Sequence, residues 1–295
     1  MSGIRVGNNM QLEIEVLSKK YKNLLALNMV SCRLKEGIYG LLGPNGAGKS
    51  TLMKLLVQNI RPTAGRICMD GTDIFKMGDA YKGMLGYMPQ QQELFPFFTG
   101  RRFLNYMGLL KGMNKKELPD AIEKIAGKVN LSDVLDKKIG GYSGGMKQRL
   151  LIAQAFLGDP KIVIFDEPTA GLDPKERIHA RNLIAENAED KIILIATHVV
   201  QDIEYIANKV ILLKKGEIVE IDSPENMQQR LDGKVWELTV DTAKAGEYMS
   251  KYLVSSAVRY GDNTKIRFLS ENAPASDALN VKPDLEDVYL YVFGG

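Results

Sequence analysis

Cysteine, histidine and long apolar runs are scarce in this chain of 295 residues. Its only cysteines, Cys32 and Cys68, have no metal-binding or redox spacing, which indicates a reduced, cytoplasmic setting. Apolar runs such as Ile192–Ala196 are far shorter than the roughly 18 residues that indicate a membrane-spanning helix. The N-terminus has no basic region followed by an apolar core, so a secretory signal is not expected. If the protein acts at a membrane, we expect a separate chain to supply the spanning part.

A large excess of either charge is also missing. The 39 basic and 36 acidic residues leave a formal net charge of +3, which argues against nucleic acid or an anionic membrane surface as a partner. Hydrophobic residues make up 45% of the chain and charged residues 25%, so the chain can form a sizeable core. The length fits one large or two modest domains.

A glycine-rich segment is the most informative feature that is present. Its residues are Gly43, Pro44, Asn45, Gly46, Ala47, Gly48, Lys49, Ser50 and Thr51. The apolar run 38–42 before it and the apolar positions Leu52, Leu55 and Leu56 after it predict a strand, a loop and a helix that runs to about Asn59. The loop fits the phosphate-binding pattern G-x-x-x-x-G-K-[ST], in which amide groups and the lysine bind phosphates and the hydroxyl ligates Mg²⁺. The alternative is a glycine-rich turn with a chance lysine.

Two further regions have recognisable patterns. Alternating apolar residues over 11–35 predict an antiparallel pair of strands, with Tyr21 in the turn between them. Tyr21 is either a rim residue of this hairpin or a flat surface for an adenine ring. Residues 97–158 are predicted to be helical, with Thr99 capping the first helix and Pro119 near the start of the second.

A second glycine-rich segment precedes an apolar helix at residue 149. Ser143 can cap this helix, and Gly144 and Gly145 expose its first amide groups. Such a helix start favours anions. An ordinary capped helix after a flexible turn is the alternative interpretation.

Polar residues follow two buried strands. Asp166 and Glu167 end the apolar run that starts at Ile162, and His198 follows the run 192–196. Runs that are apolar on both faces are typical of parallel sheets, which bind ligands at the carboxyl ends of their strands. The functional interpretation gives Asp166 to Mg²⁺ and Glu167 to the attacking water. The alternatives are a helix cap for the carboxylates and a structural role for the histidine.

The remaining segments predict a small C-terminal unit. A hairpin is expected around Lys215 and a boundary at 223–224. Strands at 235–240 and 265–269, a helix near 246–253 and a last helix after Pro283 follow. We therefore predict one domain over 1–222, with an inserted helical subdomain at about 97–158, and a second over 223–295.

These segments, in this order, resemble the ATP-binding cassette of ABC transporters over about residues 11–222. The resemblance implies an α/β fold, a P-loop NTPase of ABC type with an antiparallel β subdomain and an inserted helical subdomain, here followed by a small C-terminal α+β extension. It implies an ATPase that uses ATP and Mg²⁺, pairs with a second, identical or different, cassette and drives a separate transmembrane permease. Its location would be the cytoplasmic face of the membrane, with no nucleic acid as partner.

The resemblance also implies roles for individual residues. Tyr21 would stack on adenine, and residues 43–51 would bind the phosphates. Gln90 would sense Mg²⁺ and the γ-phosphate, and His198 would contact the γ-phosphate. Asp166 and Glu167 keep the roles given above.

A second group of residues would meet the ATP that is bound to the partner cassette. It consists of the signature segment with Ser143, Gly144 and Gly145, and of the loop that ends in Asp173. The signature departs from many members at Tyr142 and Met146, a form that is similar to one branch of exporters. The terminal segment 283–290 is also similar to ATPases that export drugs, bacteriocins or sodium, so we expect an exporter.

Two questions stay open. Phe95, Phe97 and Phe98 either line a groove for the permease, where Arg102 replaces a frequent glutamate, or belong to the core of the helical lobe. The extension is either regulatory or a structural, dimer-stabilising element. A soluble ABC-type ATPase that acts on ribosomes or nucleic acid is the alternative function, but the chain has one phosphate loop, no heptad arm and almost no net charge.

Overall fold

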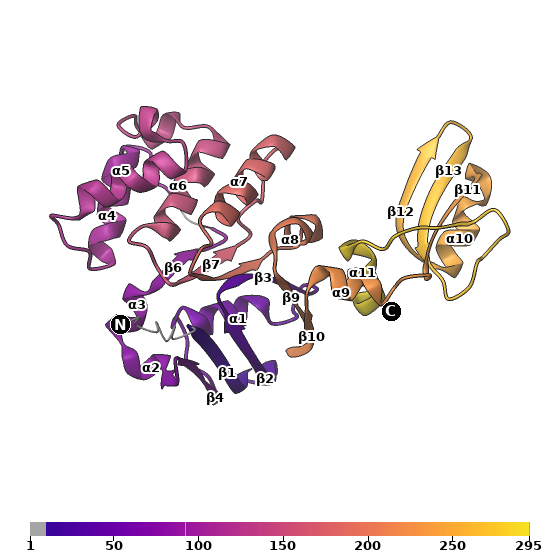
Figure 1. Ribbon diagram of the computed structural model, residues 1–295, viewed down its shortest axis with the longest axis horizontal. Helices are drawn as coiled ribbons and strands as arrows, with labels where there is room; N and C mark the ends of the chain where they lie inside the picture. Colours follow the sequence, from indigo (N-terminus) through magenta and orange to yellow (C-terminus); the bar gives the residue numbers. More distant parts are fainter. Residues whose placement is uncertain (1–9, 92, 295) are drawn as a thin grey trace, which may run out of the picture.

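The computed structural model describes residues 10–91 and 93–294 (Figure 1). The N-terminal residues 1–9, on which the expectation about a secretory signal depends, lie outside this range. In the part that is described, every helix is too short or too polar to cross a membrane.

The N-terminal part of the described chain contains an antiparallel sheet. Its strands, in spatial order, are β2 (Leu24–Lys35), β1 (Gln11–Tyr21), β4 (Ala64–Met69) and β5 (Thr72–Asp73). This confirms the strand pair predicted at 11–35. Tyr21, however, is not in the turn as predicted: it is the last residue of β1 and pairs with Leu24 of β2. The short helices α2 (Ile74–Met77) and α3 (Asp79–Gly83) then connect this sheet to the main one.

The main sheet has six strands and places the loops of interest on one edge. Its spatial order is β10 (Glu217–Asp222), β9 (Lys209–Lys214), β3 (Gly37–Leu42), β8 (Ile192–Ala196), β7 (Ile162–Asp166) and β6 (Leu85–Met88). All neighbours pair in parallel except β10, which is antiparallel to β9. Because parallel strands end at the same edge, the phosphate loop after β3 meets the polar residues that follow β6, β7 and β8.

Apolar clusters cover both faces of the main sheet. On one face, α1 (Lys49–Leu56) and the antiparallel sheet pack together through residues such as Leu17, Leu41 and Leu52. The other face is covered by α6 (Gly144–Phe156), α7 (Pro174–Glu186) and α8 (Val200–Ile206). The prediction that α1 reaches Asn59 was wrong, because Gln58 adopts a left-handed conformation with φ 59° and the helix ends before it.

The helical lobe contains α4 (Gly100–Leu110), α5 (Leu118–Lys128) and α6. The predicted caps are confirmed: Thr99 accepts a hydrogen bond from the Arg102 amide, and Ser143 accepts one from the Met146 amide, both at 3.1 Å. Tyr142 is buried, and its hydroxyl donates to the Val134 carbonyl at 2.7 Å. The tyrosine of the signature variant is therefore part of the lobe core.

A third sheet lies at the opposite end of the molecule from the helical lobe (Figure 1). Its spatial order is β12 (Leu253–Tyr260), β13 (Asn263–Leu269), β11 (Val235–Asp241) and β14 (Leu279–Asn280), with α10 (Ala245–Lys251) against one face. The sequence predicted β11 and β13 but missed β12 and β14, and Leu253 belongs to a strand rather than to the predicted helix. Most of β12 is an exposed edge, so it lacks the apolar alternation that reveals a half-buried strand, and β14 has two residues.

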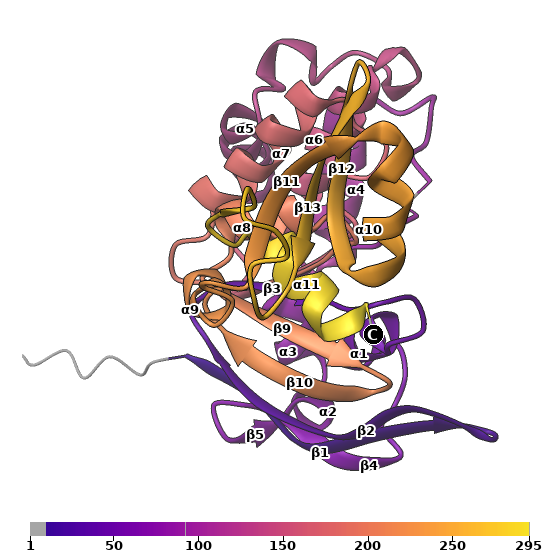
Figure 2. The same cartoon turned by 90° about the vertical axis from the view of Figure 1, so that its right-hand side faces the viewer.

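Two helices of the C-terminal region pack on the cassette, and the second of them also contacts the third sheet. They are α9 (Pro224–Gln229) and α11 (Leu285–Phe293), which lie between the third sheet and the main sheet (Figures 1 and 2). Met227 and Leu285 are buried in the same apolar cluster as Ile203 of α8. The last helix therefore packs on residues that precede position 222. The domain boundary predicted after residue 222 stays a prediction.

Candidate functional site

A cleft of about 600 Å³ opens at the carboxyl edge of the main sheet. The phosphate loop, the ends of β7 and β8 and the β1–β2 hairpin supply its walls. Many of the predicted residues meet there: Tyr21, Asn45, Gly46, Ala47, Gly48, Lys49, Ser50, Thr51, Gln90, Asp166, Glu167 and His198. Leu24, Ala26 and Met53, which the sequence did not single out, also line it.

The phosphate loop has a backbone that requires glycine. Gly46 and Gly48 have φ values of 80° and 110°, in the left-handed half of the map where other residues are strained. A Cβ atom on Gly43 would lie 2.1 Å from the Leu213 carbonyl oxygen. These constraints let successive amide groups turn toward one point, which is the geometry of an anion site at a helix start.

Lys49 is the cation of the cleft. Its ammonium donates hydrogen bonds to the carbonyl oxygens of Gly43 and Pro44. Burial lowers the pKa of Lys49, while the charges of Glu167 and Asp166 oppose that shift. The ammonium is thus held by its own loop and lies in the field of both carboxylates.

Asp166 has the environment of a cation ligand. Burial raises the pKa of Asp166, the negative charge of Glu167 raises it further, and Lys49 partly compensates. A bound cation would stabilise the ionised carboxylate. Together with the Ser50 hydroxyl and the Gln90 amide, Asp166 offers the oxygen ligands that Mg²⁺ prefers. The described residues contain no group of three or more His, Cys, Asp or Glu side chains that could hold a metal. Mg²⁺ is commonly bound by one or two carboxylates together with the phosphates of a substrate.

The Glu167 carboxylate is fixed by the end of β8. Its Oε2 accepts a hydrogen bond from Thr197 Oγ1 at 3.1 Å and lies 2.8 Å from His198 Nδ1, and its Oε1 accepts from the His198 amide at 3.1 Å. Its own backbone is left-handed, with φ 55°, and its amide donates to the Ala196 carbonyl at 2.8 Å. A strained conformation held by this many contacts is typical of a functional site.

Two residues with positioning contacts were missed from the sequence. Thr197 links the end of β8 to Glu167 through its hydroxyl group. Its place in the sequence, directly before His198, could have indicated this role. Asp202 is buried in α8. It accepts a hydrogen bond at 2.6 Å from the Oγ1 atom of Thr169, which lies two residues after Glu167 in the sequence. Because Thr169 and Asp202 are far apart in sequence, local patterns could not reveal this contact.

The remaining predicted residues lie outside the cleft. The described residues that line the cleft do not include four predicted ones, Ser143, Gly144, Gly145 and Asp173. They gather instead where α6 and α7 begin. Asp173 caps α7 by accepting from the Glu176 amide at 2.9 Å, and Glu176 lies against Gly145, where a Cβ atom would be 2.1 Å from its Oε2. One chain therefore carries two separate polar surfaces.

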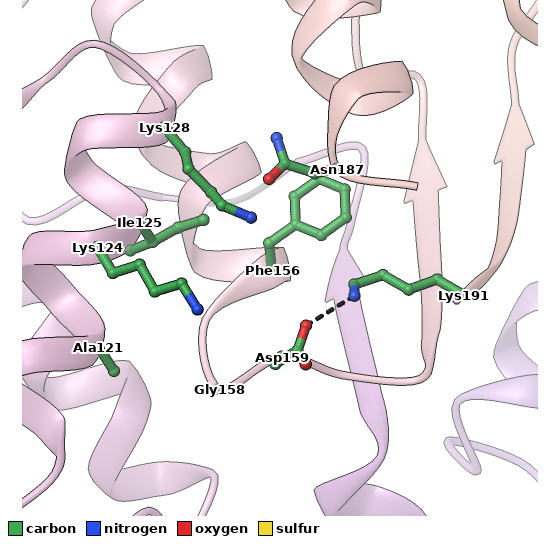
Figure 3. A pocket seen from close by; sticks show the side chains of 9 residues that line it. All are labelled: Ala121, Lys124, Ile125, Lys128, Phe156, Gly158, Asp159, Asn187 and Lys191. Atoms are coloured by element: carbon green, nitrogen blue, oxygen red, sulfur yellow. Dashed lines mark hydrogen bonds and ion pairs between the residues drawn. The ribbon is translucent and has the colours of Figure 1, made fainter. Parts of the chain in front are cut away.

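A smaller cavity of about 150 Å³ lies at the opposite, amino edge of the main sheet (Figure 3). Lys124 and Lys128 of α5 point into it, and Lys191 pairs with Asp159 across it at 2.7 Å. Since Asp159 and Lys191 precede β7 and β8, this cavity is separated from the cleft by the length of the strands.

Comparison with known proteins gives a consistent family. The profile of the family described as "ABC transporter" matches residues 27–170. YxlF, an uncharacterized ABC transporter ATP-binding protein of Bacillus subtilis, is 36% identical over 84% of this chain and 82% of its own length. NatA, an ABC transporter ATP-binding protein of the same organism, is 32% identical over 71% of this chain and 87% of its own. ABC transporter A family member 3 of Arabidopsis thaliana is 34% identical, but this chain spans 25% of that much longer protein.

Solved structures give the same answer. An ATP-binding subunit of an ABC transporter is 26% identical and superposes with a TM-score of 0.66, over 74% of this chain and 92% of that one. A dimeric, post-hydrolysis ATP-binding cassette bound to ADP and phosphate is 25% identical, with a TM-score of 0.62 over 72% of this chain and 98% of that one. The predicted P-loop fold of ABC type is confirmed. The chain belongs to the ATP-binding cassette family of ABC transporters, in which it is an ATP-hydrolysing subunit.

Proposed function

We propose that this chain is the ATPase subunit of an exporter and that it closes over ATP with a second cassette. The observation that carries the proposal is the division of polar residues between two surfaces. The cleft holds the phosphate loop, Asp166 and Glu167, whereas Ser143 and Asp173 lie elsewhere on the chain. A γ-phosphate bound in the cleft is then covered by the signature segment of the second cassette.

On the cleft side, the chain binds and orients the nucleotide. The loop amides and Lys49 hold the phosphates. Ser50, Asp166 and Gln90 are the proposed ligands of Mg²⁺, which neutralises charge on the β- and γ-phosphates when bound. Glu167 orients the attacking water and accepts its proton. His198 holds Glu167 in place through Nδ1 and contacts the γ-phosphate with its exposed ring.

On the signature side, the chain contributes donors to the partner's ATP. The first amide groups of α6 have no carbonyl partner within the helix, as at any helix start. The Ser143 side chain accepts from one of them, the Met146 amide, so other amide groups of the first turn can donate to a phosphate. Gly144 and Gly145 have no bulky side chains to keep a phosphate away. Asp173, at the start of α7, lies in the loop that is proposed to cross the dimer. Loss of the shared phosphate after hydrolysis would let the cassettes part.

The role of Tyr21 gives a graded prediction. Tyr21 is 39% exposed and lines the cleft, and one base–aromatic stack contributes about 1 kcal/mol at the lower end of its range. We expect Tyr21→Ala to weaken ATP binding roughly fivefold, as measured by titration with a fluorescent ATP analogue. Tyr21→Phe keeps the ring and should bind like the parent chain. Equal affinity for ATP in both variants would exclude the stack.

Export and the permease are proposed from the helical lobe and from the relatives. The aromatic patch is defined as Phe95, Phe97, Phe98 and Tyr106, at the start of the helical lobe and in α4. Phe95 and Phe98 have ring centroids 4.9 Å apart, and the Arg102 guanidinium covers Phe98 at 4.1 Å. Phe97 is 83% exposed. An exposed apolar side chain beside a packed aromatic base is typical of a protein contact.

The aromatic patch can be tested by capture from membranes. We expect the tagged chain to retain a multi-helix permease, identified by mass spectrometry, and Phe97→Asp to lower the recovered permease at least tenfold. This corresponds to the loss of about 1.4 kcal/mol or more at a buried anchor. Tyr260→Asp, which changes another exposed aromatic residue on β12 (63% exposed), should recover the permease normally. Permease capture that survives Phe97→Asp would contradict this contact, and capture of a ribosome instead would revive the alternative function.

This function places the chain at the cytoplasmic face of the membrane, attached through its permease. Relatives named for transporters and the near-neutral charge favour transport over ribosomes or nucleic acid.

A further inference from the structure

Helix α8 connects the C-terminal extension to the catalytic histidine. The helix begins at Val200, two residues after His198, so its position determines where the histidine lies. Val200 and Ile203 are buried against the cassette. Asp202 ties the same helix to the loop after Glu167 through Thr169, and Arg181 of α7 adds a contact to it at 3.2 Å.

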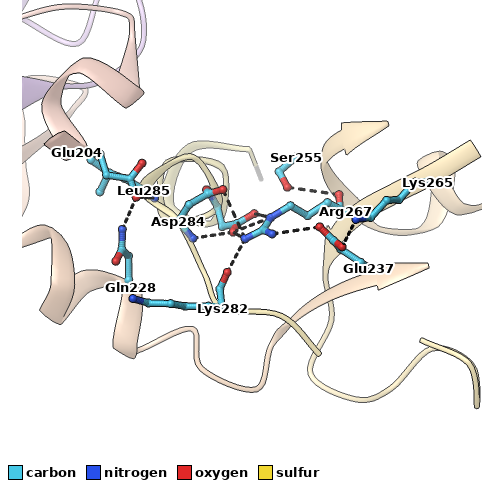
Figure 4. A network of polar contacts seen from close by, with 10 residues as sticks. Glu204, Gln228, Glu237, Ser255, Lys265, Arg267, Lys282, Asp284 and Leu285 are labelled. Atoms are coloured by element: carbon cyan, nitrogen blue, oxygen red, sulfur yellow. Dashed lines mark hydrogen bonds and ion pairs between the residues drawn. The ribbon is translucent and has the colours of Figure 1, made fainter. Parts of the chain in front are cut away.

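The other side of α8 is held by residues 223–295. Glu204 Oε1 accepts hydrogen bonds from the Leu285 amide at 3.3 Å and from Gln228 Nε2 at 2.6 Å (Figure 4). The Leu285 side chain is completely buried in the cluster that contains Ile203. Glu204 therefore satisfies a free amide in the first turn of α11, and an apolar contact reinforces the hydrogen bonds.

The start of α11 is in turn tied to the third sheet. The Arg267 guanidinium on β13 donates to Asp287 Oδ2 at 2.7 Å. It also donates to the Lys282 carbonyl at 2.7 Å (Figure 4). Asp287 is completely buried and forms a reciprocal capping box with Asp284. Because these contacts fix α11 to β13, a displacement of the third sheet would be transmitted to Leu285 and so to α8.

Negative charges lie on both sides of the contact between α8 and the C-terminal extension, and their repulsion weakens that contact. Glu204, Asp284 and Glu286 surround a surface cavity of about 510 Å³. Burial raises the pKa of all three carboxyl groups, and the charges of neighbouring carboxylates raise it further. The hydrogen bonds and the buried leucine hold the extension on α8, while the repulsion between these groups opposes it.

We propose that the C-terminal extension regulates ATP hydrolysis by positioning α8, and with it His198, through Glu204 and Leu285. This inference depends on the proposed role of His198. Glu204 is a positioning residue and touches neither nucleotide nor water. The control acts on the hydrolytic step, because Glu204 and Leu285 hold α8, whereas the phosphate loop that binds ATP lies between β3 and α1.

The test separates the hydrolytic step from nucleotide binding. Glu204→Ala removes the acceptor for two hydrogen bonds, and we expect kcat to fall roughly three- to tenfold, in line with one or two lost hydrogen bonds. The dissociation constant for ATP should change less than twofold. Glu204→Gln keeps an acceptor oxygen and should restore most of kcat. Glu225→Ala removes another carboxylate of the same cavity and should leave kcat unchanged.

A double-mutant cycle shows whether Glu204 acts through His198. In a His198→Ala chain, Glu204→Ala should cause no further loss of kcat. Multiplicative losses, or a Glu204→Ala chain that weakens ATP binding as much as kcat, would overturn the inference and leave the role of His198 intact. A His198→Ala chain with normal kcat would instead overturn the proposed function of His198, and the inference with it. Urea unfolding of each variant excludes global destabilisation as the cause.

Discussion

Glu167→Gln is expected to lower kcat for ATP hydrolysis roughly 10²- to 10⁴-fold, which is the usual contribution of a general base. Glutamine has almost the same shape but cannot accept a proton from the attacking water. The amide oxygen can still accept from the His198 amide, as Oε1 does in the parent chain at 3.1 Å. Since the phosphate loop is unchanged, ATP still binds, and dimers with trapped ATP should accumulate.

Two measurements together check this expectation. Phosphate release gives kcat, and size-exclusion chromatography with ATP gives the fraction of dimer. Glu186→Gln is a matched control, because Glu186 is an exposed carboxylate in the last turn of α7. Full activity in Glu167→Gln would remove Glu167 from its proposed role. Loss of activity without ATP-dependent dimers would contradict the shared site instead.

Lys49→Ala should slow ATP hydrolysis strongly by lowering the affinity for the nucleotide. Charge-assisted hydrogen bonds contribute about 1.5–3 kcal/mol each, so we expect ATP to bind roughly 10- to 150-fold more weakly. The ammonium also holds the carbonyl oxygens of Gly43 and Pro44, so the loop loses an internal contact at the same time. The two carboxylates, Asp166 and Glu167, would then face the phosphates without this compensating charge.

Titration with a fluorescent ATP analogue measures the effect directly. Lys54→Ala is the control, since Lys54 is exposed on the same helix and lies outside the lining of the cleft in the described part of the chain. It should bind ATP within twofold of the parent chain. If Lys49→Ala bound ATP equally well, the cleft would have to be reassigned to a ligand other than a nucleotide phosphate.

The parts of the site that the sequence predicted correctly have local causes. The phosphate loop depends on glycines at fixed positions, and Gly46 and Gly48 do adopt left-handed conformations. The caps at Thr99 and Ser143 depend on a hydroxyl three residues before an amide. The apolar run 162–165 predicted a central strand, and β7 does have parallel neighbours on both sides.

The parts that could not be predicted depend on long-range packing. Nothing near Glu204 indicates that its carboxylate will meet the Leu285 amide, and nothing near Glu167 indicates that His198 Nδ1 will bind it. Such contacts exist because the whole sheet brings the segments together. The edge strand β12 was missed for a related reason: its side chains face solvent, so they carry no pattern of burial.

The strand order of the main sheet also has a consequence for how the protein is made. β3 carries the phosphate loop, yet its parallel neighbours are β8 and β9, so that Gly37 pairs with Ile192. During synthesis from the N-terminus, β3 therefore has no strand to pair with until most of the cassette has left the ribosome, and its apolar residues stay exposed. Such distant pairings are slow to form and expose unpaired strand edges in the meantime. A nascent chain that stops before β8 would carry a complete phosphate loop, but β3 would lack both of its neighbouring strands.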